Sequence, residues 1–169
     1  NHGLLHSGAR YAVTDGESAR ECIAENQILR RIARHCIEPT DGLFITLPED
    51  DLAFQATFIT ACRAAGIQAE AIDPALARRI EPSVNPILTG AVKVPDGTVD
   101  PFRLTAANML DAREHSARIL TGHEVTGLIR EGHRVRGVRL FNTQYNEHSE
   151  LYASVVVNAA GIWGQRIAE

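Results

Sequence analysis

The sequence lacks a long apolar run, an excess of basic residues and any close pairing of its few cysteines. No stretch approaches the ~20 apolar residues of a membrane-spanning helix, and residues 1–20 lack the apolar segment of a signal peptide. The formal charge of -4 gives no basic field for a polyanion, so nucleic acid is not an expected partner.

Cysteine usage argues against disulfide and zinc roles. Cys22, Cys36 and Cys62 are odd in number, have no metal-ligand spacing and fall among apolar helical positions, which indicates reduced, buried thiols in a cytosolic protein. His2 and His6 have the spacing of metal ligands on a helix, but Gly3 disfavours a helix there. We expect no metal site.

The composition that remains is that of a globular chain, with 44% hydrophobic and 22% charged residues among 169. Apolar positions at helical spacing predict helices over about 15–36, 50–65, 74–81 and 101–115. Thr14 and Glu17 have the spacing of a capping box for the first, and Gly66 ends the second. Asp73-Pro74 and Asp100-Pro101 begin the other two.

Strands are predicted where β-branched and alternating apolar residues occur between turn residues. These segments are 42–47, 67–72, 90–94 with a turn at 95–97, and a hairpin over 118–140 that turns at 131–133. The polar segment 142–149 is predicted to be a loop. The segment 154–163 is predicted to begin as a strand buried on both faces and to lead into a new helix.

Two stretches could carry chemistry. In the opening loop, Gly3 and Gly8 would let backbone approach a flat ligand, and Arg10 beside Tyr11 suits a phosphate or carboxylate. A surface turn with a paired arginine explains these residues as well. The small residues of "VVNAAG" at 156–161 are compatible with a nearby cofactor or with tight strand-to-helix packing. We interpret the other arginines on helices as solvated and assign no function to Arg30, Arg31, Arg34, Arg78 and Arg79.

Three longer stretches carry a resemblance to a known family. They are "NHGLLHSGARY" at 1–11, "VPDGTVDPFRLTAANMLDAREHSARILTGHEVTGLI" at 94–129 and "VVVNAAGIWGQRIAE" at 155–169. They resemble the A-subunit family of bacterial anaerobic glycerol-3-phosphate dehydrogenases, within the superfamily of flavoproteins that includes amino-acid oxidases. The resemblance extends over essentially the whole chain.

The resemblance implies an α/β (mixed α+β) fold, a partial FAD-binding Rossmann-like domain with an inserted part of a substrate domain. Residues 1–40 would be the first part of the FAD-binding domain, 41–99 a partial substrate (cap) domain, and 100–169 the second part of the FAD-binding domain. It also implies catalytic roles for His6 and Arg10, and substrate binding by Arg10 and Tyr11. FAD contacts would come from Gly3, Leu4, Leu5, His6, Val125, Ala159, Ala160, Gly161 and Trp163.

The activity implied is the oxidation of sn-glycerol 3-phosphate to dihydroxyacetone phosphate by FAD, with electrons passed to quinone. The implied partners are the other polypeptides of the complex, one of them a membrane anchor, which would make the parent cytoplasmic and peripheral to the inner membrane. The alternatives are a related FAD-dependent amine or amino-acid oxidase and an inert structural or assembly fragment.

Both ends of the sequence fall within expected elements, so we expect an internal fragment of a longer chain. The family's G-x-G-x-x-G turn, which holds a pyrophosphate at a helix N-terminus, would precede residue 1. We therefore expect the fragment alone neither to retain FAD nor to be active.

Overall fold

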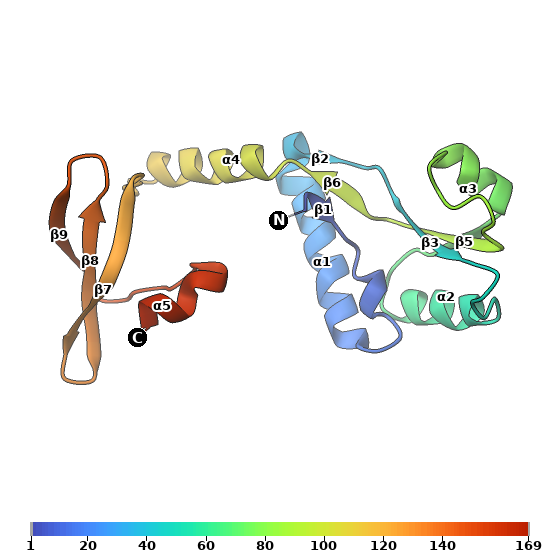
Figure 1. Ribbon diagram of the computed structural model, residues 1–169, viewed down its shortest axis with the longest axis horizontal. Coiled ribbons are helices and arrows are strands. Elements are labelled where there is room, and N and C mark those ends of the chain that lie inside the picture. Colours follow the sequence, from blue (N-terminus) through green and yellow to red (C-terminus); the bar gives the residue numbers. More distant parts are fainter. Residues whose placement is uncertain (1, 169) are drawn as a thin grey trace. The chain divides into compact units, whose positions relative to one another are not determined.

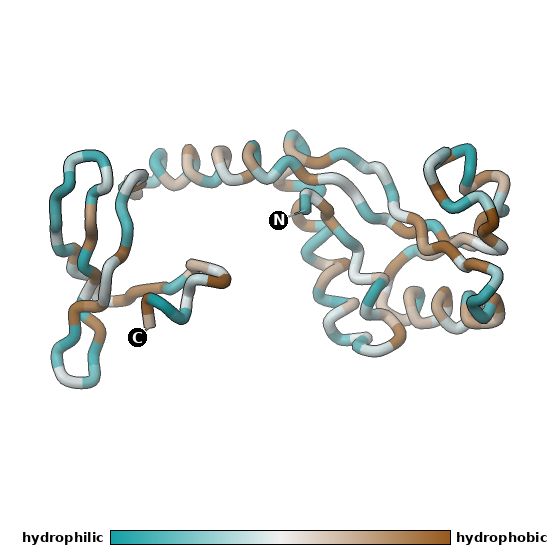
Figure 2. The backbone as a smooth tube through the Cα atoms, viewed as in Figure 1, coloured by the Kyte–Doolittle hydropathy of each residue, from teal (hydrophilic) through white to brown (hydrophobic). Residues whose placement is uncertain are grey.

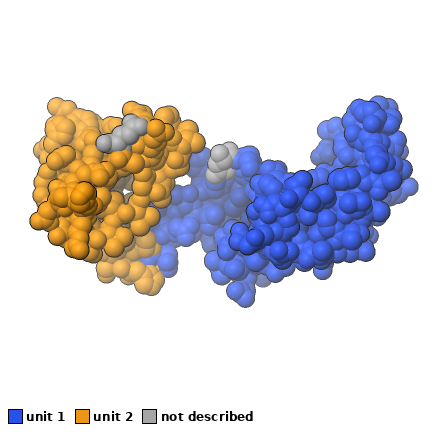
Figure 3. Space-filling model, turned by 90° about the horizontal axis from the view of Figure 1, so that it is seen from below, with its two compact units in different colours: residues 1–111 blue, residues 112–169 orange. Residues whose placement is uncertain are grey.

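The computed structural model describes residues 2–168. The chain forms two compact units, which divide between Asp111 and Ala112 (Figure 3). Helices and strands are mixed in the chain, which confirms the predicted α/β class. The first unit contains β1 (Leu4–Leu5), α1 (Gly16–Ile32), β2 (Ile37–Glu38), β3 (Gly42–Thr46), α2 (Phe54–Ala64), β4 (Glu70–Ile72), α3 (Pro74–Ile80), β5 (Gly90–Val94) and β6 (Gly97–Val99).

The helix α1 begins one residue later than predicted. Asp15, and not Thr14, is the N-cap: its Oδ1 accepts a hydrogen bond from Ser18 N at 3.1 Å. Thr14 belongs instead to the preceding turn, in which its backbone N donates to Tyr11 O at 3.0 Å. The Ser18 hydroxyl also donates to Asp15 Oδ2 at 2.6 Å, and these hydrogen bonds hold the pKa of Asp15 below its ordinary value. The helix ends at Ile32, and a 3-10 turn, Arg34–Cys36, covers the rest of the predicted range.

The helix α2 begins four residues later than predicted, at Phe54. Two aspartates hold the preceding residues in turns, since Asp50 Oδ2 accepts from Leu47 N and Asp51 Oδ1 from Ala53 N. Phe58 and Cys62 are the buried positions. Of the apolar residues at helical spacing in the predicted range, Cys62 is buried and Ile59 packs against the core, whereas Leu52 and Ala56 are exposed. Gly66 has φ +84° and ends the helix region as predicted.

The strands β3, β5 and β4 form an antiparallel sheet with a helix on each face (Figure 1). Phe44 lies opposite Val92, and both face the main core with residues of α1 and α2. Ile45 lies opposite Ala91, and both face a smaller core with Ala77 of α3. The period-2 alternation along β5 thus separates two apolar layers.

A second, smaller sheet holds the start of the chain. The strand β6 pairs antiparallel with β1, where Leu4 lies opposite Thr98, and with β2, where Ile37 lies opposite Val99. This sheet places the opening loop next to the turn at residues 95–97.

The caps predicted for the next two helices are present. Asp73 Oδ1 accepts from Ala75 N at 2.7 Å, and Asp100 Oδ1 accepts from both Phe102 N and Arg103 N at 3.0 Å. The second of these caps begins α4 (Pro101–Glu114), which crosses the boundary between the units. Apolar residues recur along α4 (Figure 2), but none of its side chains is buried among the described residues.

The second unit contains a three-stranded antiparallel sheet of β7 (His123–Glu131), β8 (Arg134–Asn142) and β9 (Glu147–Tyr152), followed by a 3-10 turn (Gly161–Trp163) and α5 (Gly164–Ala168). The hairpin prediction is confirmed, with Gly132 at φ +57° in the turn. The loop predicted over 142–149 is wrong, because β9 pairs with β8 from Glu147 onward. The residues of β9 are almost all exposed and do not alternate between apolar and polar, so the sequence carries no sign of a strand there.

The strand predicted at the start of 154–163 is not formed. Within residues 2–168 no strand pairs with this segment, and Val155 and Val157 are 74% and 81% exposed. A strand buried on both faces needs neighbouring strands and covering layers, and its own side chains cannot supply them.

Candidate functional site

Backbone contacts hold the start of the opening loop, residues 3–5, in place. Gly3 has φ +67°, and its carbonyl accepts a hydrogen bond from Val99 N at 2.8 Å. A Cβ on Gly3 would lie 3.3 Å from Val99 O, which leaves little room for another residue. Gly3, Leu4 and Leu5 therefore form an ordered edge of the small sheet.

The loop then turns directly onto α1. Gly8 has φ +88°, and a Cβ there would lie 2.7 Å from Cys22 Cβ and 2.8 Å from Ala19 O. A 3-10 turn, Ala9–Tyr11, follows, with Ala9 buried. Because the backbone of residue 8 lies so close to α1, only glycine fits there. This contact sets where the following turn begins.

The predicted catalytic residues His6 and Arg10 lie on either side of Gly8. His6 is half-buried, and its ring meets the Tyr11 ring edge to face at 5.9 Å between centroids. His6 Nδ1 accepts from Gly8 N at 3.2 Å, so the neutral ring carries its proton on Nε2. Arg10 is exposed, and among residues 2–168 no hydrogen bond or ion pair occupies its guanidinium.

A polar cluster under the loop was not predicted. Asp96, which is buried, accepts from Ser7 N through Oδ1 at 2.6 Å. Asn26, also buried, donates through Nδ2 to Leu5 O at 3.2 Å. Asn26 lies three residues after the buried Ile23 on α1, and an amide at a core-facing position is the signal that sequence analysis could have used.

Arg30 corrects the interpretation of the helix arginines as solvated. Its Nε donates to Asn26 Oδ1 at 2.8 Å, and its Nη2 donates to Asp96 O at 2.7 Å and Pro95 O at 3.1 Å. Arg78 is also engaged, since its Nη1 donates to Pro86 O at 3.2 Å. Arg30 thus ties α1 to the 95–97 turn, whereas Arg31 on the same helix is exposed.

The remaining predicted contacts lie in the second unit. Val125 and Trp163 line one depression with Glu124, Thr126, Arg166 and Ile167. The Arg166 guanidinium carbon is 5.7 Å from the Trp163 ring centroid, and Trp163 is 58% exposed. Gly161 has φ +57° and open space where a Cβ would be. Ala159 is exposed and Ala160 is half-buried, in a turn in which Asn158 Oδ1 accepts from Ala160 N.

These features fit a flavin nucleotide. An exposed indole beside a guanidinium suits a planar heterocycle and a phosphate, and the open backbone at Gly161 admits close approach of a ligand. The ordered edge at Gly3–Leu5 provides backbone beside His6. Each region is suited to part of such a ligand.

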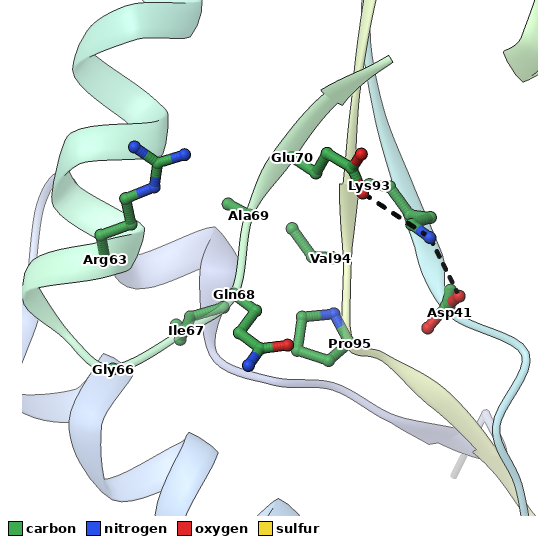
Figure 4. A pocket seen from close by; sticks show the side chains of 10 residues that line it. All are labelled: Asp41, Arg63, Gly66, Ile67, Gln68, Ala69, Glu70, Lys93, Val94 and Pro95. Carbon is green, nitrogen blue, oxygen red and sulfur yellow. Dashed lines mark ion pairs between the residues drawn. The ribbon is translucent and has the colours of Figure 1, made fainter.

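A further depression in the first unit contains none of the predicted site residues (Figure 4). Lys93 Nζ lies 3.9 Å from both Asp41 Oδ2 and Glu70 Oε2, and Arg63 comes from the end of α2. The charges there compensate one another at the surface, so the depression presents no field of one sign.

The described residues contain no group of three His, Cys, Asp or Glu side chains placed to hold a metal ion. Over the same residues, no helix has the length and apolar character that crossing a membrane requires. Cys36 and Cys62 are buried, as predicted, whereas Cys22 is only half-buried.

The comparisons with known proteins agree on one family. The family described as FAD dependent oxidoreductase matches residues 1–169. The A-subunit of anaerobic glycerol-3-phosphate dehydrogenase from Escherichia coli (strain K12) is 79% identical over 169 residues, which is 100% of this chain and 31% of that protein. The chain therefore spans about a third of the length of this relative.

Two solved structures share the fold. L-proline dehydrogenase from P. horikoshii has a TM-score of 0.78 at 23% identity, covering 90% of this chain and 41% of that one. Glycerol-3-phosphate dehydrogenase from Bacillus halodurans, complexed with FAD, has a TM-score of 0.63 at 21% identity, covering 96% of this chain and 26% of that one. At these identities the likeness concerns the fold alone.

Proposed function

The chain belongs to the family of FAD-dependent oxidoreductases, and on that premise we propose that it forms part of a dehydrogenase that oxidises sn-glycerol 3-phosphate to dihydroxyacetone phosphate. The observation that supports this substrate is the 79% identity, over all 169 residues, to the A-subunit of the E. coli anaerobic glycerol-3-phosphate dehydrogenase. Since that relative is named as one subunit of several, we include further subunits in the proposal, with one that anchors the complex to the inner membrane and electrons passed on to quinone.

We propose that FAD, when bound, supplies the acceptor for the hydride of the substrate's secondary alcohol carbon. Backbone at Gly3–Leu5 and the ring of His6 would lie along the flavin. The residues proposed to contact the rest of the cofactor are Val125, Ala159, Ala160, Gly161 and Trp163. In this proposal residues 1–40 and 100–169 belong to the FAD-binding domain and 41–99 to the substrate domain.

Arg10 is proposed to bind the substrate. Its exposed guanidinium has no partner among residues 2–168, so a phosphate or developing negative charge would not have to displace an existing ion pair. Tyr11, with its ring against His6, would line the same pocket. His6 is held with Nδ1 as an acceptor, so its Nε2–H can donate a hydrogen bond that orients the substrate oxygen. In this tautomer His6 does not take the hydroxyl proton, which would pass to a base outside these residues.

The proposed substrate is tested by flavin reduction in a full-length enzyme that carries this sequence, made by replacing the matching 169 residues of the E. coli relative. Without oxygen, glycerol 3-phosphate should bleach the visible flavin absorbance, whereas L-proline and glycine should leave it unchanged. Bleaching by an amino acid alone would identify an amino-acid oxidase instead. A dye or quinone acceptor should then restore the absorbance.

A further inference from the structure

We propose that Asp96 is the positioning residue of the opening loop: its carboxylate holds the loop, through Ser7, in the conformation in which His6 and Arg10 face the flavin and the substrate. This inference rests on the proposed function, because that function assigns the loop to the flavin. Asp96 itself acts through Ser7.

The contact that carries the inference is short and buried. Ser7 N donates to Asp96 Oδ1 at 2.6 Å, and the two residues are 0% and 8% exposed. A carboxylate that accepts a hydrogen bond in a buried site is a stronger acceptor than a neutral oxygen. Ser7 lies between His6 and Gly8, so this bond fixes the backbone from which the neighbouring functional side chains leave.

Asp96 is in turn held in place by α1. The Arg30 guanidinium donates to Asp96 O at 2.7 Å and to Pro95 O at 3.1 Å. The Arg30 Nε bond to Asn26 Oδ1, at 2.8 Å, orients the Asn26 amide toward Leu5 O. One guanidinium therefore connects the backbone of Asp96, whose carboxylate lies under Ser7, with the Asn26 amide under Leu5.

Two glycines make room for this arrangement. A Cβ on Gly97 would lie 3.0 Å from Arg30 Nη2 and 2.9 Å from Glu38 O. A Cβ on Gly42 would lie 2.7 Å from Asp96 Oδ2. The carboxylate and the guanidinium thus occupy space that a side chain at Gly42 or Gly97 would take.

The Ser7 side chain gives the loop no second anchor beside the Asp96 contact. Ser7 Oγ is buried, and among the described residues it has no hydrogen-bond partner. Without the carboxylate, the buried Ser7 amide would also lose its partner, and turning this segment toward water is the way to satisfy it. Such a movement would carry His6 and Arg10 with it.

The experiment uses the full-length enzyme that carries this sequence, with Asp96→Ala, Asp96→Asn and Arg30→Lys. Arg31→Lys is the matched control on the exposed side of α1, and Ala77→Gly is a control that weakens the smaller core away from the loop. Amide hydrogen exchange over residues 5–9 is measured without FAD. The flavin absorption spectrum and the dissociation constant for FAD are measured with it.

We expect Asp96→Ala to speed exchange at Ser7 about tenfold or more, to alter the flavin spectrum and to raise the FAD dissociation constant about tenfold. Asp96→Asn keeps an acceptor oxygen and should restore most of each property. Arg30→Lys should give a smaller change of the same kind, because an ammonium cannot reproduce the forked donors. Neither control should move the spectrum.

Unchanged exchange at Ser7 in both Asp96→Ala and Arg30→Lys would overturn the inference. Faster exchange with an unchanged flavin spectrum would overturn it too, since the loop would then be held by Asp96 without serving the flavin. If the unmodified enzyme did not oxidise glycerol 3-phosphate, the proposed function would be wrong, and the exchange measurement would still decide whether Asp96 holds the loop.

Discussion

At the residue scale, Arg10 and Arg30 show how the same side chain takes opposite roles. Arg30 uses its donors on Asn26, Pro95 and Asp96, inside the first unit. Arg10 leaves an exposed 3-10 turn and has no partner among the described residues. A structural arginine is recognised by its satisfied donors, and a candidate binding arginine by donors that are still available.

This contrast leads to a prediction for Arg10→Ala in the full-length enzyme. Loss of a charge-assisted hydrogen bond to the substrate should lower kcat/KM for glycerol 3-phosphate about 10- to 100-fold. Arg10→Lys should recover part of the loss, because it keeps the charge but loses the fork. Steady-state kinetics measure the effect, with Arg31→Ala as control. An unchanged kcat/KM in Arg10→Ala would remove this residue from the site.

A second residue-scale prediction concerns Gly8 and Gly16. At Gly8, a methyl group would meet Cys22 Cβ at 2.7 Å, and the φ of +88° disfavours any side chain. Gly8→Ala should therefore lower the free energy of unfolding by about 2 kcal/mol or more. Gly16→Ala, where the nearest atom is Arg20 Nη1 at 3.6 Å, should be neutral or stabilise α1 by up to ~1 kcal/mol. Urea unfolding compares the two, and equal losses would contradict the packing described.

At the scale of elements, α2 illustrates how burial sets the chemistry of a side chain. Cys62 is completely buried between α2 and the sheet, and this burial raises the pKa of its thiol above the ordinary value of 9.0. The Asp96 carboxylate raises it further by its negative charge. Cys62 is therefore a core residue and a poor nucleophile at neutral pH.

The direction of this shift predicts how stability depends on pH. A raised pKa in the folded state means that the unfolded chain loses the thiol proton first as the pH rises, so the contribution to stability is complete below about pH 9 and is lost above it. Above that pH, the free energy of unfolding should fall by at most ~1.4 kcal/mol per pH unit because of Cys62. When the free energy of unfolding is measured as a function of pH, the Cys62→Ala variant should lack this part of the alkaline decline. An identical alkaline decline in both proteins would assign it to other groups.

At the scale of the whole molecule, the proposed FAD contacts are divided between the two compact units. The opening loop belongs to the first, and Val125 and Trp163 belong to the second. The contribution of each set of residues to the affinity for FAD can be measured separately and without reference to catalysis.

The corresponding prediction is made for Trp163→Ala in the full-length enzyme. Removal of the indole that stands beside Arg166 should raise the FAD dissociation constant about tenfold, whereas Trp163→Phe should keep most of the affinity through its aromatic face. Quenching of flavin fluorescence measures binding. Tyr145→Ala, at an exposed position between β8 and β9, is the control. Equal affinity in Trp163→Ala and the control would exclude this depression as a cofactor contact.

Local signals predicted most of the elements. Asp73-Pro74 and Asp100-Pro101 identified two helix starts, and alternating apolar residues identified the hairpin β7–β8. These features depend on neighbours a few residues apart, which the sequence displays directly. The family and its cofactor class followed from the resemblance carried by residues 1–11, 94–129 and 155–169, and the family match confirms them.

What the sequence could not decide depends on contacts between distant residues. Nothing local indicated that Asp96 would lie under Ser7, 89 positions away, or that Arg30 would leave the solvated face of α1 to reach the turn beside it. Strand β9 and the segment after it were misassigned, because pairing and burial belong to the partner strand and the layers around it. The sequence by itself determined most of the elements and the family, and it proposed the candidate residues. Only the tertiary structure decided which polar groups hold the loop, because a buried amide must find its partner in space and not along the chain.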